Sequence, residues 1–173
     1  DDVADGLCRK LLERHPHVFQ SASVSGTEDV LDKWDAIKRQ QKGLSTHASA
    51  MEAVARSLPA LWRAEKIQKK AAKIGFDWED ADGALSKLYE EIGELRDAAA
   101  TGGNVQEELG DLLFAAVNVA RFIGVDPEQA LSDTCDKFIR RFSYIEDRAV
   151  DEGVPMEKLG LKKMDELWEE AKQ

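Results

Sequence analysis

Two short segments of the sequence contain the same pair of acidic residues. LYEEIGEL contains Glu91 and Glu94, three positions apart. VQEELGDL contains Glu108 and Asp111 at the same spacing. Residues three apart lie on one side of a helix, and a carboxylate on an apolar helix is costly unless it is paired or binds a metal ion. Each segment therefore presents two carboxylates that could do chemistry together.

The turn between the segments brings the two pairs to one height. The tetrapeptide ATGG is so short that the helices on either side should be antiparallel neighbours. Counting outward from its midpoint places Glu94 level with Leu109 and Glu91 level with Leu112. Four carboxylates at one level would repel one another, whereas oxygen ligands in this arrangement suit Mg²⁺, with Mn²⁺ as a possible substitute. The sequence therefore predicts a site for a hard divalent cation.

Basic residues should approach the same level from the next helix. Counting across the turn at 124–127 places Lys137 level with Phe114 and Arg141 level with Gly110. A metal ion and basic side chains can share the oxygens of a polyphosphate between them. The net charge of −10 disfavours nucleic acid and anionic membranes as partners, but not a phosphorylated ligand whose charge is neutralised locally.

Less specific explanations of the charged residues stay open. Paired acidic residues are common on solvated helix faces, and Glu90 could face solvent. Glu107 suits a capping box with Asn104. Lys137 and Arg141 could be surface residues that interact favourably with the helix dipole near a helix end. The doubled spacing, the equal height and the apolar setting together favour a site over these explanations.

Two other kinds of metal site fit the sequence less well. A di-iron site of the ferritin type needs Glu-x-x-His, and no histidine lies near the acidic motifs. His15 and His17 form an H-x-H pair that could bind a metal, although the proline between them favours a structural turn. The acidic motifs remain the stronger candidate.

The apolar spacings are almost all helical, which predicts an all-α helical bundle. Asp77 could cap one helix, Asp126 followed by Pro127 should begin another, and Gly124 should end the one before it. The tryptophans at 34, 62 and 78 suit packing anchors, whereas the role of Trp168 is open. The expected helices span 2–14, 28–41, 49–74, 78–99, 104–123, 127–150 and 156–171.

The composition fits a folded, non-membrane chain. Its 173 residues are 43% hydrophobic and 34% charged, enough for one helical domain and a smaller piece. The longest apolar run, around 112–120, is far too short to cross a bilayer. Cys8 and Cys135 are too few for a disulfide framework, which favours the reducing cytosol. The chain begins with Asp, so we expect a piece of a longer protein.

A short internal repeat predicts the domain organisation. CRKLLER, residues 8–14, and CDKFIRR, residues 135–141, place Cys, Lys and Arg at matching positions. We expect residues 1–42 to be the tail of a preceding repeat, 43–50 to be a linker, and 51–173 to be a complete domain.

Several separated motifs resemble the MazG-type all-α nucleoside triphosphate pyrophosphohydrolases. Besides the two acidic motifs, the similarity includes LPALWRAEKIQKKAAKIGFDW, EELGDLLFAAVNVAR, KFIRRF and KMDELWEEAK, in the family's order. It covers about residues 50–173. KLLERHPHVF and VLDKWDAIK are similar to the end of the first of two tandem MazG domains, whose own acidic motifs are missing here.

The resemblance implies Mg²⁺-dependent hydrolysis of a nucleoside triphosphate, canonical or aberrant, to the monophosphate and pyrophosphate, in a cytoplasmic homodimer. The alternative is a non-catalytic helical dimer that binds nucleotide or a regulatory protein. The preferred base and sugar and the general base cannot be read from the sequence. By motif position, the implied metal ligands and catalytic residues are Glu91, Glu94, Glu108 and Asp111, and the implied nucleotide-binding residues are Lys87, Glu90, Asn104, Glu107, Lys137, Arg140, Arg141 and Trp168.

Overall fold

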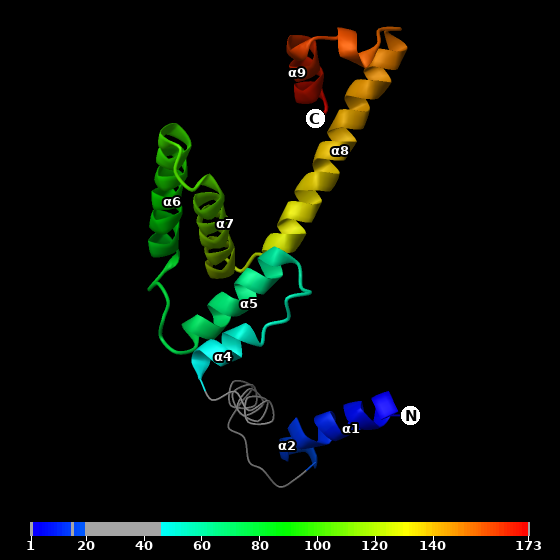
Figure 1. The fold of residues 1–173 in the computed structure, drawn as a ribbon. Coiled ribbons are helices and arrows are strands. Elements are labelled where there is room, and N and C mark those ends of the chain that lie inside the picture. Colours follow the sequence, from blue (N-terminus) through cyan, green and yellow to red (C-terminus); the bar gives the residue numbers. More distant parts are fainter. Residues whose placement is uncertain (1, 15, 20–45, 173) are drawn as a thin grey trace. The chain divides into compact units, whose positions relative to one another are not determined.

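The computed structural model describes residues 2–14, 16–19 and 46–172, and every regular element in these ranges is a helix (Figure 1). The all-α prediction is confirmed. None of the described helices is both long enough and apolar enough to cross a membrane. The elements are α1 (Asp2–Arg14), α2 (Pro16–Phe19), α4 (His47–Glu52), α5 (Ala60–Ala72), α6 (Ala81–Thr101), α7 (Val105–Phe122), α8 (Pro127–Asp151), the 3₁₀ helix η1 (Met156–Lys158) and α9 (Leu161–Glu170).

The chain divides into two compact units. One comprises Asp1–Leu58 with Lys66–Asp77, and the other comprises Pro59–Glu65 with Trp78–Gln173. The second unit contains every residue predicted for the acidic and basic site. The domain boundaries drawn from the sequence stay predictions, although α4 begins at His47, inside the segment expected to be a linker.

Three expectations fall on residues that the structure does not describe. They are the helix at 28–41, the first part of the linker at 43–45, and the metal-binding pair of His15 and His17, whose side chains are both outside the described set.

Two helices predicted as continuous are each interrupted. The helix expected at 49–74 is divided into α4, which ends at Glu52, and α5, which begins at Ala60. Pro59 keeps α5 from extending further towards the N-terminus, because it restricts the residue before it to non-helical conformations. The helix expected at 156–171 is divided into η1 and α9 at Gly160, whose φ of 71° is left-handed. Apolar spacing alone did not reveal either interruption.

The predicted helix caps are confirmed for α7 and α8 and wrong for α6. Asn104 Oδ1 accepts the Glu107 N–H at 3.3 Å. Glu107 Oε2 accepts from the side-chain amide of Asn104 at 2.7 Å and not from its backbone N–H, so the N-cap is confirmed without the capping box. Asp126 caps α8 ahead of Pro127. Helix α6, however, begins at Asp80, whose Oδ1 accepts the Gly83 N–H at 2.9 Å, and not at Asp77 as we expected.

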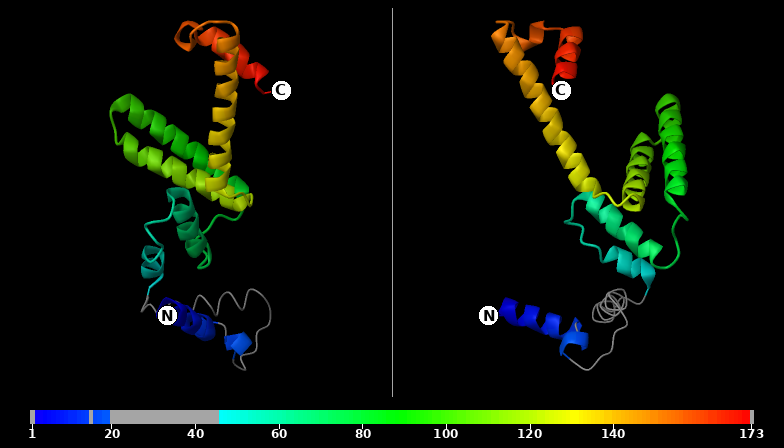
Figure 2. Two further views of the ribbon diagram at one scale, coloured as in Figure 1. Left: turned by 90° about the vertical axis from the view of Figure 1, so that its right-hand side faces the viewer. Right: turned by 180° about the vertical axis from the view of Figure 1, so that it is seen from behind.

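Helices α6 and α7 form the predicted antiparallel hairpin and lie side by side in every view (Figure 2). Gly102, with φ of 76°, ends α6 in the left-handed conformation. At Gly103 a Cβ atom would come within 3.2 Å of the Ala98 Cα, so the turn needs a residue without a side chain there. These glycines bring α7 back along α6.

Helices α8 and α9 pack against each other by their apolar faces. Ile145 and Ala149 of α8 and Leu167 of α9 are buried. Two polar contacts join the same helices, since Tyr144 Oη lies 3.2 Å from Glu170 Oε2 and Lys163 Nζ lies 3.4 Å from Glu152 Oε1. This pair positions the basic residues of α8 beside the aromatic residue of α9.

Candidate functional site

Glu91 is buried because it occupies the centre of the α6 face that packs in the hairpin. Ala84, Glu91 and Ala98 are seven residues apart, two helical turns, and all three are buried. Helical spacing in the sequence predicts that Leu85, Leu88, Ile92 and Leu95 form an apolar stripe, with Glu91 at its edge. The stripe is rotated from that prediction, because the small alanines take the packed positions and Ile92 is 48% exposed.

Three of the predicted carboxylates gather at this point. Glu91, Glu94 and Glu108 each offer a carboxylate oxygen, and these three oxygens lie within 4.8 Å of one another. Glu91 is buried, Glu108 is half-buried and Glu94 is exposed. The group is therefore open to solvent on one side and covered on the other.

The group fits a divalent cation. Glu91 Oε2 is buried and has no hydrogen-bond partner among the described residues. Leaving a carboxylate oxygen buried without a donor is costly, and two further carboxylates beside it raise the cost by repulsion. A hard cation such as Mg²⁺ or Mn²⁺ takes carboxylate oxygens of this kind as ligands. Glu91, Glu94 and Glu108 are thus suited to hold one.

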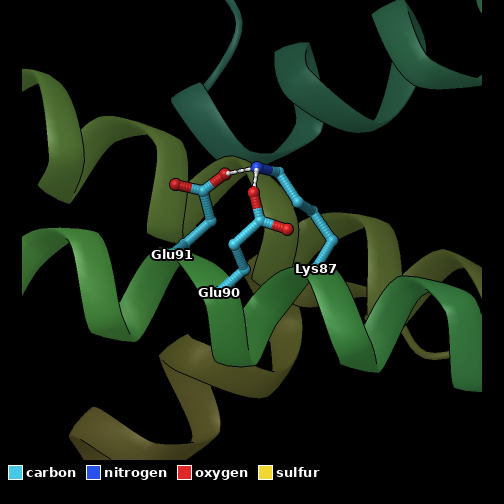
Figure 3. Close-up of polar contacts among 3 residues, drawn as sticks. All are labelled: Lys87, Glu90 and Glu91. Atoms are coloured by element: carbon cyan, nitrogen blue, oxygen red, sulfur yellow. Dashed lines mark hydrogen bonds and ion pairs between the residues drawn. The ribbon is translucent and has the colours of Figure 1, made fainter.

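Lys87 brings a positive charge to the buried member of the group, Glu91 (Figure 3). Its Nζ lies 2.7 Å from Glu90 Oε1 and 2.7 Å from Glu91 Oε1. The hydrogen bonds to Glu90 and then to Glu91 raise the pKa of Lys87 above its ordinary value, so the ammonium stays charged. The other oxygen of Glu91 points away from the lysine in Figure 3.

Glu91 raises the pKa of the neighbouring Glu94. A hydrogen bond to Glu91 is the largest cause, followed by desolvation and the charge of Glu91. An ionised carboxylate has no hydrogen to donate, so Glu94 can make this bond only when its own carboxyl group is protonated. A metal ion held by Glu94 would therefore compete with this proton.

The fourth predicted ligand and the predicted nucleotide-binding residues do not join the group of three carboxylates as closely. Asp111 is exposed and lies outside the group of three. Asn104 and Glu107 bond to each other at the start of α7. Lys137 and Arg140 lie on α8, and among the described residues no ion pair joins α8 to the three carboxylates. The equal height predicted for the basic and acidic residues stays a prediction.

Aromatic residues accompany the basic ones on α8. The Arg141 guanidinium carbon lies 5.5 Å from the centroid of the Trp168 ring. Phe138 lies beside the same ring, at 5.1 Å between centroids, and Phe142 stacks on Phe138 at 6.2 Å. The sequence analysis missed these two phenylalanines, although their spacing of four in KFIRRF places them on one side of a helix.

The chain is similar to known proteins over almost its whole length. Residues 80–145 match the model of the MazG nucleotide pyrophosphohydrolase domain. The chain is 40% identical to the nucleoside triphosphate pyrophosphohydrolase of Escherichia coli over 99% of its own length and 67% of that protein.

Two further relatives match along the whole chain. A nucleoside triphosphate pyrophosphohydrolase/pyrophosphatase MazG of Thermotoga maritima is 40% identical over 99% of this chain and 65% of its own length. A Bacillus subtilis protein of uncharacterised function is 48% identical over the full chain but only 36% of its own length. The match covers the acidic hairpin and the α8 basic residues together, and the chain belongs to the MazG family of nucleoside triphosphate pyrophosphohydrolases.

Proposed function

We propose that this chain hydrolyses nucleoside triphosphates to the monophosphate and pyrophosphate at the α6–α7 hairpin, in a reaction that depends on Mg²⁺ or Mn²⁺. Glu91, Glu94 and Glu108 are the proposed ligands, with Asp111 as the fourth from its motif position. The observation that carries the proposal is the buried Glu91 oxygen that has no partner among the described residues, inside a group of three carboxylates. An ordinary solvated helix face has no reason to bury an acidic residue in this way.

The residues around the group have different proposed roles in hydrolysis. A bound divalent cation would neutralise phosphate oxygens and lower the pKa of a water molecule. Glu94 is the favoured acceptor for the proton of the attacking water, because it is exposed and contact with Glu91 raises its pKa. Lys137 and Arg141 are the proposed contacts of the β and γ phosphates, where they stabilise the departing pyrophosphate.

The nucleotide itself is proposed to lie along the basic and aromatic residues of α8 and α9. Arg141 beside Trp168 combines a cation with a flat aromatic surface, and a nucleoside triphosphate needs contacts of both kinds. Arg140 on α8 and Lys87, Glu90, Asn104 and Glu107 at the hairpin complete the proposed pocket from their motif positions. The proposal includes a cytosolic location, because the two described cysteines are free thiols, which suits a reducing compartment.

Replacing one ligand tests the proposal. Glu94→Gln should lower Mg²⁺-dependent pyrophosphate release by at least about 100-fold, because it removes an anionic ligand and the proposed proton acceptor together. Asp111→Asn should also abolish turnover if it is the fourth ligand. The measurement is pyrophosphate release from mixed nucleoside triphosphates, with circular dichroism to show that helical content is retained.

Glu146→Gln is the matched control, since it makes the same chemical change at an exposed position of α8. Its activity should equal that of the native chain. Near-native activity in Glu94→Gln would remove the acidic group from the reaction, and a native chain without pyrophosphate release would favour the non-catalytic alternative.

A further inference from the structure

Lys87 has a place in the acidic group that its nucleotide-pocket position does not explain. Its ammonium bonds at 2.7 Å to two carboxylates of unlike exposure, Glu90 with a side chain 58% exposed and Glu91 with a side chain 6% exposed. Only Glu91 belongs to the group of three carboxylates. One cation is therefore divided between a buried ligand and an exposed acidic residue outside the group (Figure 3).

We propose that Lys87 is a built-in counter-ion that competes with the divalent cation for Glu91 and so sets how tightly the protein binds metal in the absence of nucleotide. This inference rests on the proposed function, because it concerns the same carboxylates. Lys87 acts through Glu91 and is a positioning residue.

The competition follows from the charges. Glu91 is the one buried acidic side chain in the described part of the chain. With Lys87 on Oε1, part of its negative charge is already compensated, and a second cation at Oε2 meets repulsion from the ammonium. The surroundings are only partly accessible to water, so this repulsion is screened less than it would be on an open surface.

Glu90 remains available as an ion-pair partner for Lys87 when a metal ion binds Glu91. The two acidic residues follow Lys87 by three and four positions, so both lie within reach of the same ammonium on one side of α6. Lys87 can therefore release Glu91 and remain paired with Glu90. Its freed N–H donor is then available to a phosphate oxygen of the substrate, which links metal binding to nucleotide binding.

Titration with Mn²⁺, followed by electron paramagnetic resonance in the absence of nucleotide, measures this competition directly. Lys87→Gln should bind Mn²⁺ more tightly, by on the order of tenfold, because one charge near the site is removed. Lys87→Gln/Glu90→Gln removes one charge of each sign and should still bind more tightly than the native chain, because Glu91 no longer shares its charge with an ammonium. Arg96→Gln removes a positive charge elsewhere on α6, from an ion pair with Asp97, and should leave the affinity unchanged.

Native or weaker Mn²⁺ affinity in Lys87→Gln would overturn the proposal. If Lys87→Gln loses its helical content, Glu90→Gln is the variant that tests the proposal. Lys87 then has Glu91 as its remaining partner, so Mn²⁺ should bind several-fold more weakly than to the native chain. Unchanged or tighter Mn²⁺ binding by Glu90→Gln would equally overturn the proposal. The native chain separates this result from the proposed function. Mn²⁺ binding by the native chain with no effect of Lys87 refutes the competition alone, whereas no Mn²⁺ binding by the native chain refutes the metal site itself.

Discussion

At the scale of single residues, the site depends on a carboxylate buried at a position that suits alanine. Glu91 lies between Ala84 and Ala98 on the packed face of α6, where it costs stability unless a cation compensates its charge. Lys87 provides part of that charge at Oε1, and Oε2 is left for a ligand. This cost supports the proposal that Glu91 is a metal ligand.

The pKa of Glu94 predicts how pH changes the stability of the metal-free protein. Contact with Glu91 raises this pKa above 4.5, so the folded chain binds a proton more tightly here than the unfolded chain does. That contribution to stability is complete below the ordinary pKa and is lost as pH rises through the raised value. In EDTA, the Tm difference between the native chain and Glu94→Gln should therefore move against the native chain as pH rises from about 4 to about 7.

Thermal unfolding followed by circular dichroism measures both Tm values. With saturating Mg²⁺ the trend should reverse, because the cation binds the ionised carboxylates and proton loss favours it. A Tm difference that does not vary with pH in EDTA would show that Glu91 does not raise the pKa of Glu94.

Spacing alone predicted three members of the acidic group correctly, because helical periodicity and a short turn fix which residues meet. It did not predict the buried position of Glu91, which depends on which face of α6 the small alanines allow to approach α7. Spacing also could not show whether Asp111 joins the group. This residue lies on α7 but is exposed, and residue spacing does not say how far a side chain reaches.

At the scale of helices, the N-caps of α7 and α8 were predicted correctly, whereas the N-cap of α6 and the two helix interruptions were not. Asp126–Pro127 begins α8 as expected, because both residues act through their own backbone and side chain. The interruption before Pro59 was missed, since the apolar spacing continues across it. The rotation of α6 was missed for a different reason, because packing against α7 decides it.

Asp126 does more than cap a helix. Its Oδ1 accepts the N–H groups of Glu128 and Gln129 at 3.0 Å, and the Trp62 indole donates to the same oxygen at 2.8 Å. Asp126→Ala should therefore lower the free energy of unfolding by about 2 kcal/mol, at the upper end for an N-cap. Urea unfolding measures it.

Asp126→Asn is the control for that change, because asparagine is an equally good N-cap and keeps an oxygen acceptor. It should retain most of the stability. A loss in Asp126→Ala no larger than in Asp126→Asn would contradict the assignment of these three hydrogen bonds.

At the scale of the whole molecule, exposed apolar residues predict a homodimer. Leu109, Leu113 and Phe114 of α7 and Leu131 and Ile139 of α8 are all exposed, and so many large apolar side chains on neighbouring helices indicate a partner surface. We propose that a second copy of the chain covers them. Sedimentation should show a dimer at micromolar concentration.

Ile139→Glu tests the proposed surface, since Ile139 is 62% exposed and a charge there would be buried by a partner. It should shift the sedimentation equilibrium towards monomer by at least tenfold in the dissociation constant, on the order of the cost of burying one unpaired charge. Gln129→Glu, at an exposed polar position on another side of the same helix, should not. A native chain that is monomeric and fully active would count against the dimer.

Hydrolysis in ¹⁸O-labelled water identifies which bond of the triphosphate breaks. Water activated at the acidic hairpin attacks the α-phosphorus in this account, while Lys137 and Arg141 stabilise the departing pyrophosphate. Mass spectrometry of the products of Mg²⁺-dependent turnover should therefore find the label in the nucleoside monophosphate and none in the pyrophosphate. Label in the pyrophosphate, or a nucleoside diphosphate and free phosphate as the first products, would contradict the account.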